Sequence, residues 1–188
     1  MDVKTIAVIG AGAMGRSLAY AAAASGFRAI LEDMSAPRLE QGSAWIHHSF
    51  DEEVARGKVT TPQKDAAIAR LSVARSVEDA SRQADLVIEA APEEMELKIE
   101  IFTLLDKFAK PGSIFASTTS SLSIAEMAAV TFRPENCVGM HFVTSVAQKN
   151  LLEIICAPET SPETIQSCRE VGRRMGREVV VVCESLAR

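Results

Sequence analysis

Residues 5–15 read Thr5-Ile6-Ala7-Val8-Ile9-Gly10-Ala11-Gly12-Ala13-Met14-Gly15, and the architecture expected for the chain follows from this segment. The first five residues form a continuous apolar run, typical of a strand buried on both faces of a parallel sheet. The next six match G-x-G-x-x-G, and residues 13–25 are mostly strong helix formers. A glycine-rich turn between a strand and a helix predicts a dinucleotide site, because the N–H groups of the helix terminus point at the phosphates.

Each glycine of this turn has its own physical reason. Gly10 allows the tight turn out of the strand, and Gly12 removes the side chain that would block the pyrophosphate. Gly15 lets helix and strand approach closely. Ala13 and Met14 complete the candidate cofactor-binding turn.

Two acids follow the next apolar run, Ala29-Ile30-Leu31. Asp33 lies eighteen residues after Gly15, where a carboxylate accepts hydrogen bonds from the adenosine ribose hydroxyls. With Glu32 beside it, this carboxylate would repel the 2′-phosphate of NADP. We therefore expect NAD as the cofactor, with Arg38 as the one nearby cation that would favour NADP. Glu32 itself is expected to be a solvated acid.

The rest of the chain alternates between apolar strands and helices. Helix-like residues 35–70, broken at 56–62, predict an inserted helical hairpin. The expected later strands lie at residues 84–89, 113–116, 137–141, 151–155 and 178–182. This alternation predicts a Rossmann-type doubly wound α/β fold with a mostly parallel sheet, forming one NAD-binding domain over residues 1–188.

Composition excludes several other classes of protein. The 188 residues carry 20 Lys plus Arg against 25 Asp plus Glu, a net charge of −5, which argues against nucleic-acid binding. No apolar run is long enough to span a bilayer and no leader precedes the first strand, so we expect a cytoplasmic protein without membrane contacts. The four cysteines include no C-x-x-C pair and predict reduced thiols without a metal site. His47 and His48 are expected on a solvated helix face.

Side chains near the ends of the later strands are the candidates for chemistry. Ser120 and Ser121 follow the strand at 113–116, His141 ends the next strand, and Glu153 lies within the following apolar run. Oxidising a secondary alcohol requires a base for the hydroxyl proton, and a neutral imidazole suits that task at cellular pH. A carboxylate on the second ring nitrogen would fix the tautomer and stabilise the imidazolium.

From residue 6 to about 185 the chain resembles the NAD-binding domain of the L-3-hydroxyacyl-CoA dehydrogenases, the β-oxidation enzymes of fatty acid metabolism. Several blocks agree in order and spacing. They are Gly10 to Gly15; Ala84-Asp85-Leu86-Val87-Ile88-Glu89-Ala90-Ala91-Pro92-Glu93 followed by Leu97-Lys98; Thr119-Ser120-Ser121-Leu122-Ser123-Ile124; Arg133-Pro134-Glu135; and Gly139-Met140-His141-Phe142 with Glu153 twelve residues beyond His141.

The resemblance implies NAD-dependent interconversion of 3-hydroxyacyl-CoA and 3-ketoacyl-CoA. It implies that His141 is the general base, that Glu153 orients it, and that Ser120 hydrogen-bonds the reacting oxygen. Glu93 and Lys98 match family residues near the nicotinamide. The helical hairpin matches helices that lie beside the CoA-binding side in the family.

Departures from the family pattern leave two alternatives open. Thr118 replaces an asparagine among the cofactor contacts of the family. Val143-Thr144-Ser145 replaces a segment that contains an Asn-Pro pair, and Lys149 is offset by one position from a family lysine. A small non-CoA 3-hydroxy acid is therefore an alternative substrate. The chain also stops at Arg188, without the helical C-terminal domain that forms the family's homodimer. A catalytically silent NAD-binding module is the second alternative.

Overall fold

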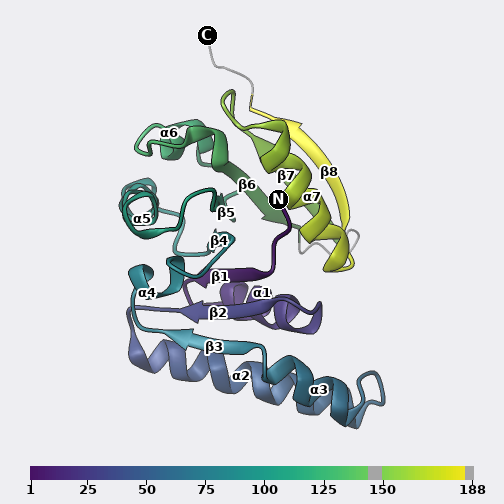
Figure 1. The fold of residues 1–188 in the computed structure, drawn as a ribbon. Helices are drawn as coiled ribbons and strands as arrows, with labels where there is room; N and C mark the ends of the chain where they lie inside the picture. Colours follow the sequence, from purple (N-terminus) through teal and green to yellow (C-terminus); the bar gives the residue numbers. More distant parts are fainter. Residues whose placement is uncertain (144–149, 185–188) are drawn as a thin grey trace.

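The computed structural model describes residues 1–143 and 150–184. In chain order its elements are β1 (Thr5–Ile9), α1 (Ala13–Ala24), β2 (Arg28–Glu32), α2 (Ala36–Ala55), α3 (Thr61–Ile68), β3 (Leu71–Ala74), α4 (Val77–Ser81), β4 (Leu86–Glu89), α5 (Met95–Phe108), β5 (Ile114–Ser117), α6 (Ile124–Ala128), the 3-10 helix η1 (Pro134–Asn136), β6 (Cys137–Phe142), β7 (Leu151–Cys156), α7 (Pro162–Arg174) and β8 (Glu178–Cys183) (Figure 1).

The strands form one sheet in the order β3-β2-β1-β4-β5-β6-β7-β8. The first six of these strands are parallel, and the order β3-β2-β1-β4-β5-β6 is that of dinucleotide-binding Rossmann folds. β7 runs antiparallel to β6, and β8 runs parallel to β7. The predicted doubly wound, mostly parallel sheet is therefore confirmed.

Helices cover both faces of the sheet, which explains the continuous apolar strands. Along β1, Ile6 and Val8 pack into a cluster that includes residues of α1, α2 and α7. Ala7 and Ile9 face the other way, into a cluster with α4, α5 and α6 (Figure 1). Because every side chain of this strand is buried, four of its five residues are apolar, and the one hydroxyl belongs to Thr5 at its start.

The segment between β2 and β4 contains more structure than the sequence predicts. α2 and α3 occupy the insertion, and Tyr20 of α1 packs on Phe50 of α2 with ring centroids 4.3 Å apart. Beyond them lie β3 and α4, for which the sequence gives no signal. β3 is an edge strand in which Ser72 and Val73 are exposed, so it lacks the apolar run that identifies the inner strands.

A crevice is expected at the carboxyl ends of β1 and β4, because the connections after these two neighbouring strands run to opposite faces of the sheet. After β1 the chain turns to α1 on one face, and after β4 it continues to α5 on the other. The two connecting loops touch: a Cβ on Gly10 would lie 2.8 Å from the Ala90 carbonyl oxygen, and the φ of Gly10 is 103°. Gly10 is therefore required both by its backbone conformation and by this close approach.

Candidate active site

The loop after β1 has the shape and the free donors of a phosphate-binding turn. Gly12 is the N-cap of α1, and no side chain in the described part of the chain caps the helix there. A Cβ on Gly12 would meet no described atom within 4 Å, and Ala13 is exposed beside it. At Gly15, in contrast, a Cβ would lie 1.7 Å from the Gly10 oxygen, so α1 rests directly on the turn. Open space in front of uncapped N–H groups fits a pyrophosphate.

Asp33 lies at the end of β2 and braces this loop. Its Oδ2 accepts a hydrogen bond from the N–H of Ala11 at 2.9 Å, and its Oδ1 accepts one from Ser35 at 2.8 Å. Each carboxylate oxygen retains a further lone pair. Asp33 can therefore hold the glycine loop and still accept hydrogen bonds from a ribose.

Glu32 is buried, contrary to the expectation of a solvated acid. Only 1% of its surface is exposed, because it lies between Ile9 of β1 and Ala74 of β3 in the sheet register. Burial, and next the charge of Asp33, raise the pKa of the Glu32 carboxyl from 4.5 to about 7. Within the described residues its Oε1 has no hydrogen-bond partner. Its main-chain oxygen accepts from the Gly10 N–H at 2.8 Å, so Glu32 and Asp33 both support the glycine loop.

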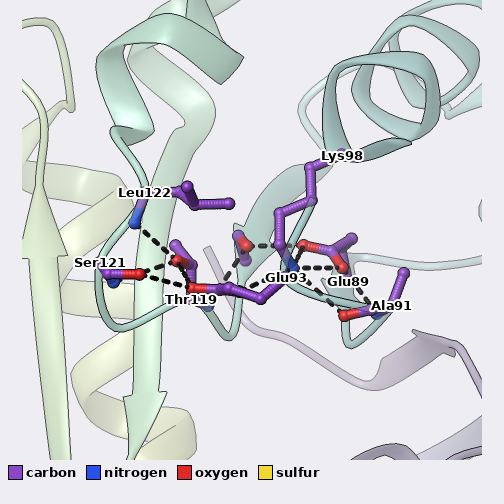
Figure 2. Close-up of polar contacts among 8 residues, drawn as sticks. Glu89, Ala91, Glu93, Lys98, Thr119, Ser121 and Leu122 are labelled. Atoms are coloured by element: carbon purple, nitrogen blue, oxygen red, sulfur yellow. Dashed lines mark hydrogen bonds and ion pairs between the residues drawn. The ribbon is translucent and has the colours of Figure 1, made fainter. Parts of the chain in front are cut away.

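A buried ion pair lies behind the loops that follow β4 and β5 (Figure 2). Glu89 and Lys98 are both fully buried, and the Lys98 Nζ donates to both Glu89 carboxylate oxygens at 2.9 Å. Glu89 also accepts from the Ser117 hydroxyl and from the Ala91 N–H, each at 2.6 Å. With several donors on one carboxylate, the desolvation of both charges is compensated.

Glu93 joins this ion pair to the loop that carries the candidate serine. Its Oε1 accepts hydrogen bonds from the hydroxyls of Thr119 and Ser121, and its Oε2 lies 3.4 Å from the Lys98 Nζ (Figure 2). Partial burial opposes ionisation, but the hydrogen bonds from Thr119 and Ser121 and the charge of Lys98 outweigh it. The pKa of the Glu93 carboxyl is therefore lowered, and the group is ionised at neutral pH.

His141 and Glu153 form a hydrogen-bonded pair. They lie opposite each other in the antiparallel register of β6 and β7, so their side chains project from the same face of the sheet. The His141 Nδ1 is 2.8 Å from the Glu153 Oε2. The two side chains are 27% and 33% exposed, which leaves the imidazole accessible to a bound molecule.

The structure places the other predicted site residues on the loop after β5. Ser120 is exposed on this loop between Thr119 and Ser121, and within the described residues it makes no hydrogen bond to His141 or Glu153. Thr118 is half-buried, and its N–H donates to the main-chain oxygen of Glu89 at 2.9 Å. The carboxyl ends of β5 and β6 are neighbours, which brings this loop to the same edge of the sheet as His141.

Sequence reasoning missed the contribution of Glu89 and Ser117 to the site. The signal in the sequence is Glu89, an acid that directly follows the apolar residues 86–88. A charge at this position would destabilise the sheet unless it had a partner. Four of the residues named as departures from the family, Thr144, Ser145, Lys149 and Arg188, lie outside the described residues.

Neither a metal site nor a membrane span is found in the described part of the chain. No group of three or more His, Cys, Asp or Glu in residues 1–143 and 150–184 is arranged to bind a metal ion. His47 and His48 are exposed on α2, and His48 lies 3.5 Å from Glu52. None of the described helices combines the length and apolar character that crossing a bilayer requires.

Comparison with known proteins gives the family of this site. Residues 5–185 match the family described as "3-hydroxyacyl-CoA dehydrogenase, NAD binding domain". The chain belongs to this family. The cofactor that the family description names is NAD, in agreement with the prediction from Asp33.

Relatives in this family are similar to the chain over nearly its whole length. A 3-hydroxybutyryl-CoA dehydrogenase from Bradyrhizobium diazoefficiens is 40% identical over 179 residues, which are 95% of this chain and 61% of the relative. The crystal structure of an (S)-3-hydroxybutyryl-CoA dehydrogenase from Ralstonia eutropha gives a TM-score of 0.91 at 34% identity, covering 98% of this chain and 65% of that chain.

A third relative extends the same likeness. The crystal structure of a 3-hydroxybutyryl-CoA dehydrogenase from Escherichia coli K12 gives a TM-score of 0.93 at 32% identity, covering 98% of this chain and 39% of that chain. The chain spans 61% and 63% of the length of two curated relatives and smaller shares of others, 38% and 25%. The predicted family, fold and cofactor are thus confirmed.

Proposed function

We propose that the protein is an NAD-dependent oxidoreductase that interconverts a 3-hydroxyacyl-CoA and the corresponding 3-ketoacyl-CoA. The observation that carries the proposal is the His141–Glu153 pair, with 2.8 Å between the Nδ1 and Oε2 atoms. The pair belongs to the same sheet edge as the loops that follow β1, β4 and β5. Relatives with this fold are named as dehydrogenases of 3-hydroxybutyryl-CoA.

His141 is the proposed general base. Its Nδ1–H donates to Glu153, so the free lone pair is on Nε2 and faces the substrate. As the hydride leaves the carbinol carbon, Nε2 takes the hydroxyl proton, and the Glu153 carboxylate stabilises the imidazolium that forms. In the reverse direction the imidazolium returns this proton to the carbonyl oxygen. Glu153 acts through His141 and is a positioning residue.

The loops after β4 and β5 complete the proposed site. The exposed hydroxyl of Ser120 is suited to donate a hydrogen bond to the substrate oxygen. Glu93 and Thr118 are proposed to face the nicotinamide end of the cofactor, with Lys98 holding the Glu93 carboxylate in place. Because Lys98 is fully buried and shared with Glu89, it is expected to orient Glu93 and to make no contact with the substrate.

The cofactor site proposed here uses the turn after β1 and the end of β2. Bound NAD supplies the acceptor for the hydride. The open N-terminus of α1 at Gly12 would bind the pyrophosphate and Asp33 would accept from the adenosine ribose. The two loops joined at Gly10 would then support the cofactor between the two halves of the sheet.

A substrate comparison tests the proposed function. The full-length protein is mixed with NADH and either acetoacetyl-CoA or free acetoacetate, and loss of NADH absorbance is recorded. We expect a kcat/KM at least about ten-fold higher for the thioester, which corresponds to ~1.4 kcal/mol of extra transition-state binding. Preference for the free acid would favour a small 3-hydroxy acid as substrate. NADH binding without turnover of either compound would favour a silent NAD-binding module.

A further inference from the structure

Two cysteines, Cys156 and Cys183, lie at the ends of neighbouring strands. Cys156 is the last residue of β7 and Cys183 is the last residue of β8, and the parallel register places them directly opposite each other. Their Sγ atoms are 2.6 Å apart. Side chains at paired positions of parallel strands project to the same side of the sheet, so this contact is set by the backbone pairing.

The backbone geometry permits a bond between the two sulfurs. Neighbouring strands are ~4.8 Å apart, and disulfides form across Cα separations of about 4.4–6.8 Å. The other two cysteines have no such arrangement: Cys137 and Cys168 are buried on β6 and α7, and burial raises the pKa of each thiol to about 12. Cys183 is the one exposed cysteine of the four.

We propose that Cys156 and Cys183 are an oxidation site that forms a reversible intramolecular disulfide when the protein meets a peroxide. No part of the dehydrogenase reaction uses these residues, so the proposal is independent of the proposed function. The cysteines are free thiols in the structure, and the disulfide is the proposed second state of the pair.

Exposure sets the order of the two steps. The Cys183 sulfur, as the thiolate, attacks one oxygen of hydrogen peroxide; an S–O bond forms, the O–O bond breaks, and the released hydroxide takes a proton to become water. The Cys156 sulfur then attacks the sulfur of this sulfenic acid; the S–S bond forms and the S–O bond breaks. The second hydroxide leaves as water with the Cys156 proton. Two thiols and one peroxide thus give one disulfide and two waters.

Burial of Cys156 suits it to the second step. Its exposed fraction is 4%, and burial, followed by the neighbouring Cys183, raises the pKa of its thiol to about 11. The Cys156 thiol is therefore kept from reacting with peroxide directly, yet it contacts the Cys183 sulfur, which reacts first. A dithiol reductant would reverse the reaction by attack on the Cys183 sulfur, the exposed side of the bond.

The disulfide would act on the active-site loop through Glu184. This residue follows Cys183, and its carboxylate accepts hydrogen bonds from the N–H groups of Ile124 at 2.6 Å and Ala125 at 3.2 Å. These N–H groups begin α6, directly after the loop that carries Ser120. Because β8 is an edge strand whose one neighbour in the sheet is β7, a bond at Cys183 would hold Glu184 more firmly on α6.

The first experiment counts thiols in the native protein before and after a stoichiometric amount of hydrogen peroxide. We expect the four thiols to fall to two, the mass to fall by two hydrogens, and a peptide map to join Cys156 to Cys183. A thiol reductant should restore all four. The proposal is overturned if the four thiols survive a peroxide dose that oxidises free glutathione, or if Cys183 is recovered only as a sulfonic acid or in a bond between two chains.

Variants test the order of the steps. Cys156→Ser should leave Cys183 as a sulfenic acid that dimedone traps, whereas Cys168→Ala should form the disulfide as the native protein does. Absence of a dimedone adduct in folded Cys156→Ser would refute Cys183 as the first sulfur to react.

Two further measurements test the effect on the fold. The melting temperature of the oxidised protein should rise by several degrees, as expected for a cross-link around a loop of about 25–30 residues. Amide hydrogen exchange at Ile124 and Ala125 should slow on oxidation. Unchanged exchange at both amides would refute the coupling to α6.

Discussion

The buried carboxyl of Glu32 gives a sharp test of the electrostatics near the proposed cofactor site. Charged residues on the neighbouring elements include Arg16 on α1, Arg38 and Glu40 on α2, and Glu78 and Asp79 on α4. Burial and the charge of Asp33 are the main causes of the raised pKa. Glu32→Gln removes the ionisation while conserving shape and volume.

The magnitude follows from the shift of the pKa from 4.5 to about 7. Each pKa unit corresponds to ~1.4 kcal/mol, so the full shift corresponds to roughly 3 kcal/mol in the free energy of unfolding. Solvent screening near the strand end reduces this contribution to about 2 kcal/mol. Since the folded-state pKa is raised, the stabilisation is complete below about pH 4.5 and is lost as the pH rises through about 7. Above that pH the native protein contains a buried charge that the variant lacks.

Denaturant unfolding of both proteins at about pH 5 and about pH 8.5 measures the effect. Relative to that of the native protein, the free energy of unfolding of Glu32→Gln should rise by about 2 kcal/mol from the lower pH to the higher. Glu40→Gln, which neutralises an exposed acid on α2, is the matched control and should show no such change. A stability difference between native protein and Glu32→Gln that is independent of pH would refute the reasoning.

Three other substitutions test the parts of the site. Lys98→Met leaves the fully buried Glu89 without its cation and should lower the free energy of unfolding by about 3–5 kcal/mol. Adding Glu89→Gln to this variant should recover much of the lost stability, and no recovery would contradict the pairing of the two side chains. Gly15→Ala places a Cβ against the Gly10 oxygen and should weaken NADH binding by about ten-fold or more in titrations while the far-UV circular dichroism is retained. Asp33→Asn should narrow the ratio of NADP to NAD dissociation constants by about ten-fold, and an unchanged ratio would exclude Asp33 as the selective residue.

The sequence predicts the inner part of the sheet because local pattern and tertiary structure agree there. The run from Ile6 to Ile9 is apolar throughout, and both faces of β1 are indeed covered by helices. The same rule does not find β3, an edge strand of four residues with two exposed side chains. Periodicity also gives no strand direction, so the antiparallel pairing of β6 and β7 follows only from the structure.

Contacts between residues distant in sequence mark the limit of sequence reasoning for the site. The pattern at Ser123 and Glu126 predicts a capping box on α6; Ser123 does accept from the Glu126 N–H, but the carboxylate at this helix terminus belongs to Glu184. Glu32 is buried by the strands on either side of β2, which a pattern along one strand does not show. The pairing of His141 with Glu153 is predicted from the resemblance to the dehydrogenase family, since the spacing of the two residues alone fits many arrangements.

Turnover by His141→Gln tests the central claim most directly. The full-length variant is assayed with NADH and acetoacetyl-CoA beside His47→Gln, which changes an exposed imidazole on α2. We expect kcat to fall by about 10²–10⁴-fold in His141→Gln only, with the NADH dissociation constant within about two-fold of the native value. Retained turnover in His141→Gln would show that the proton of the substrate goes elsewhere and would contradict the assignment of the His141–Glu153 pair.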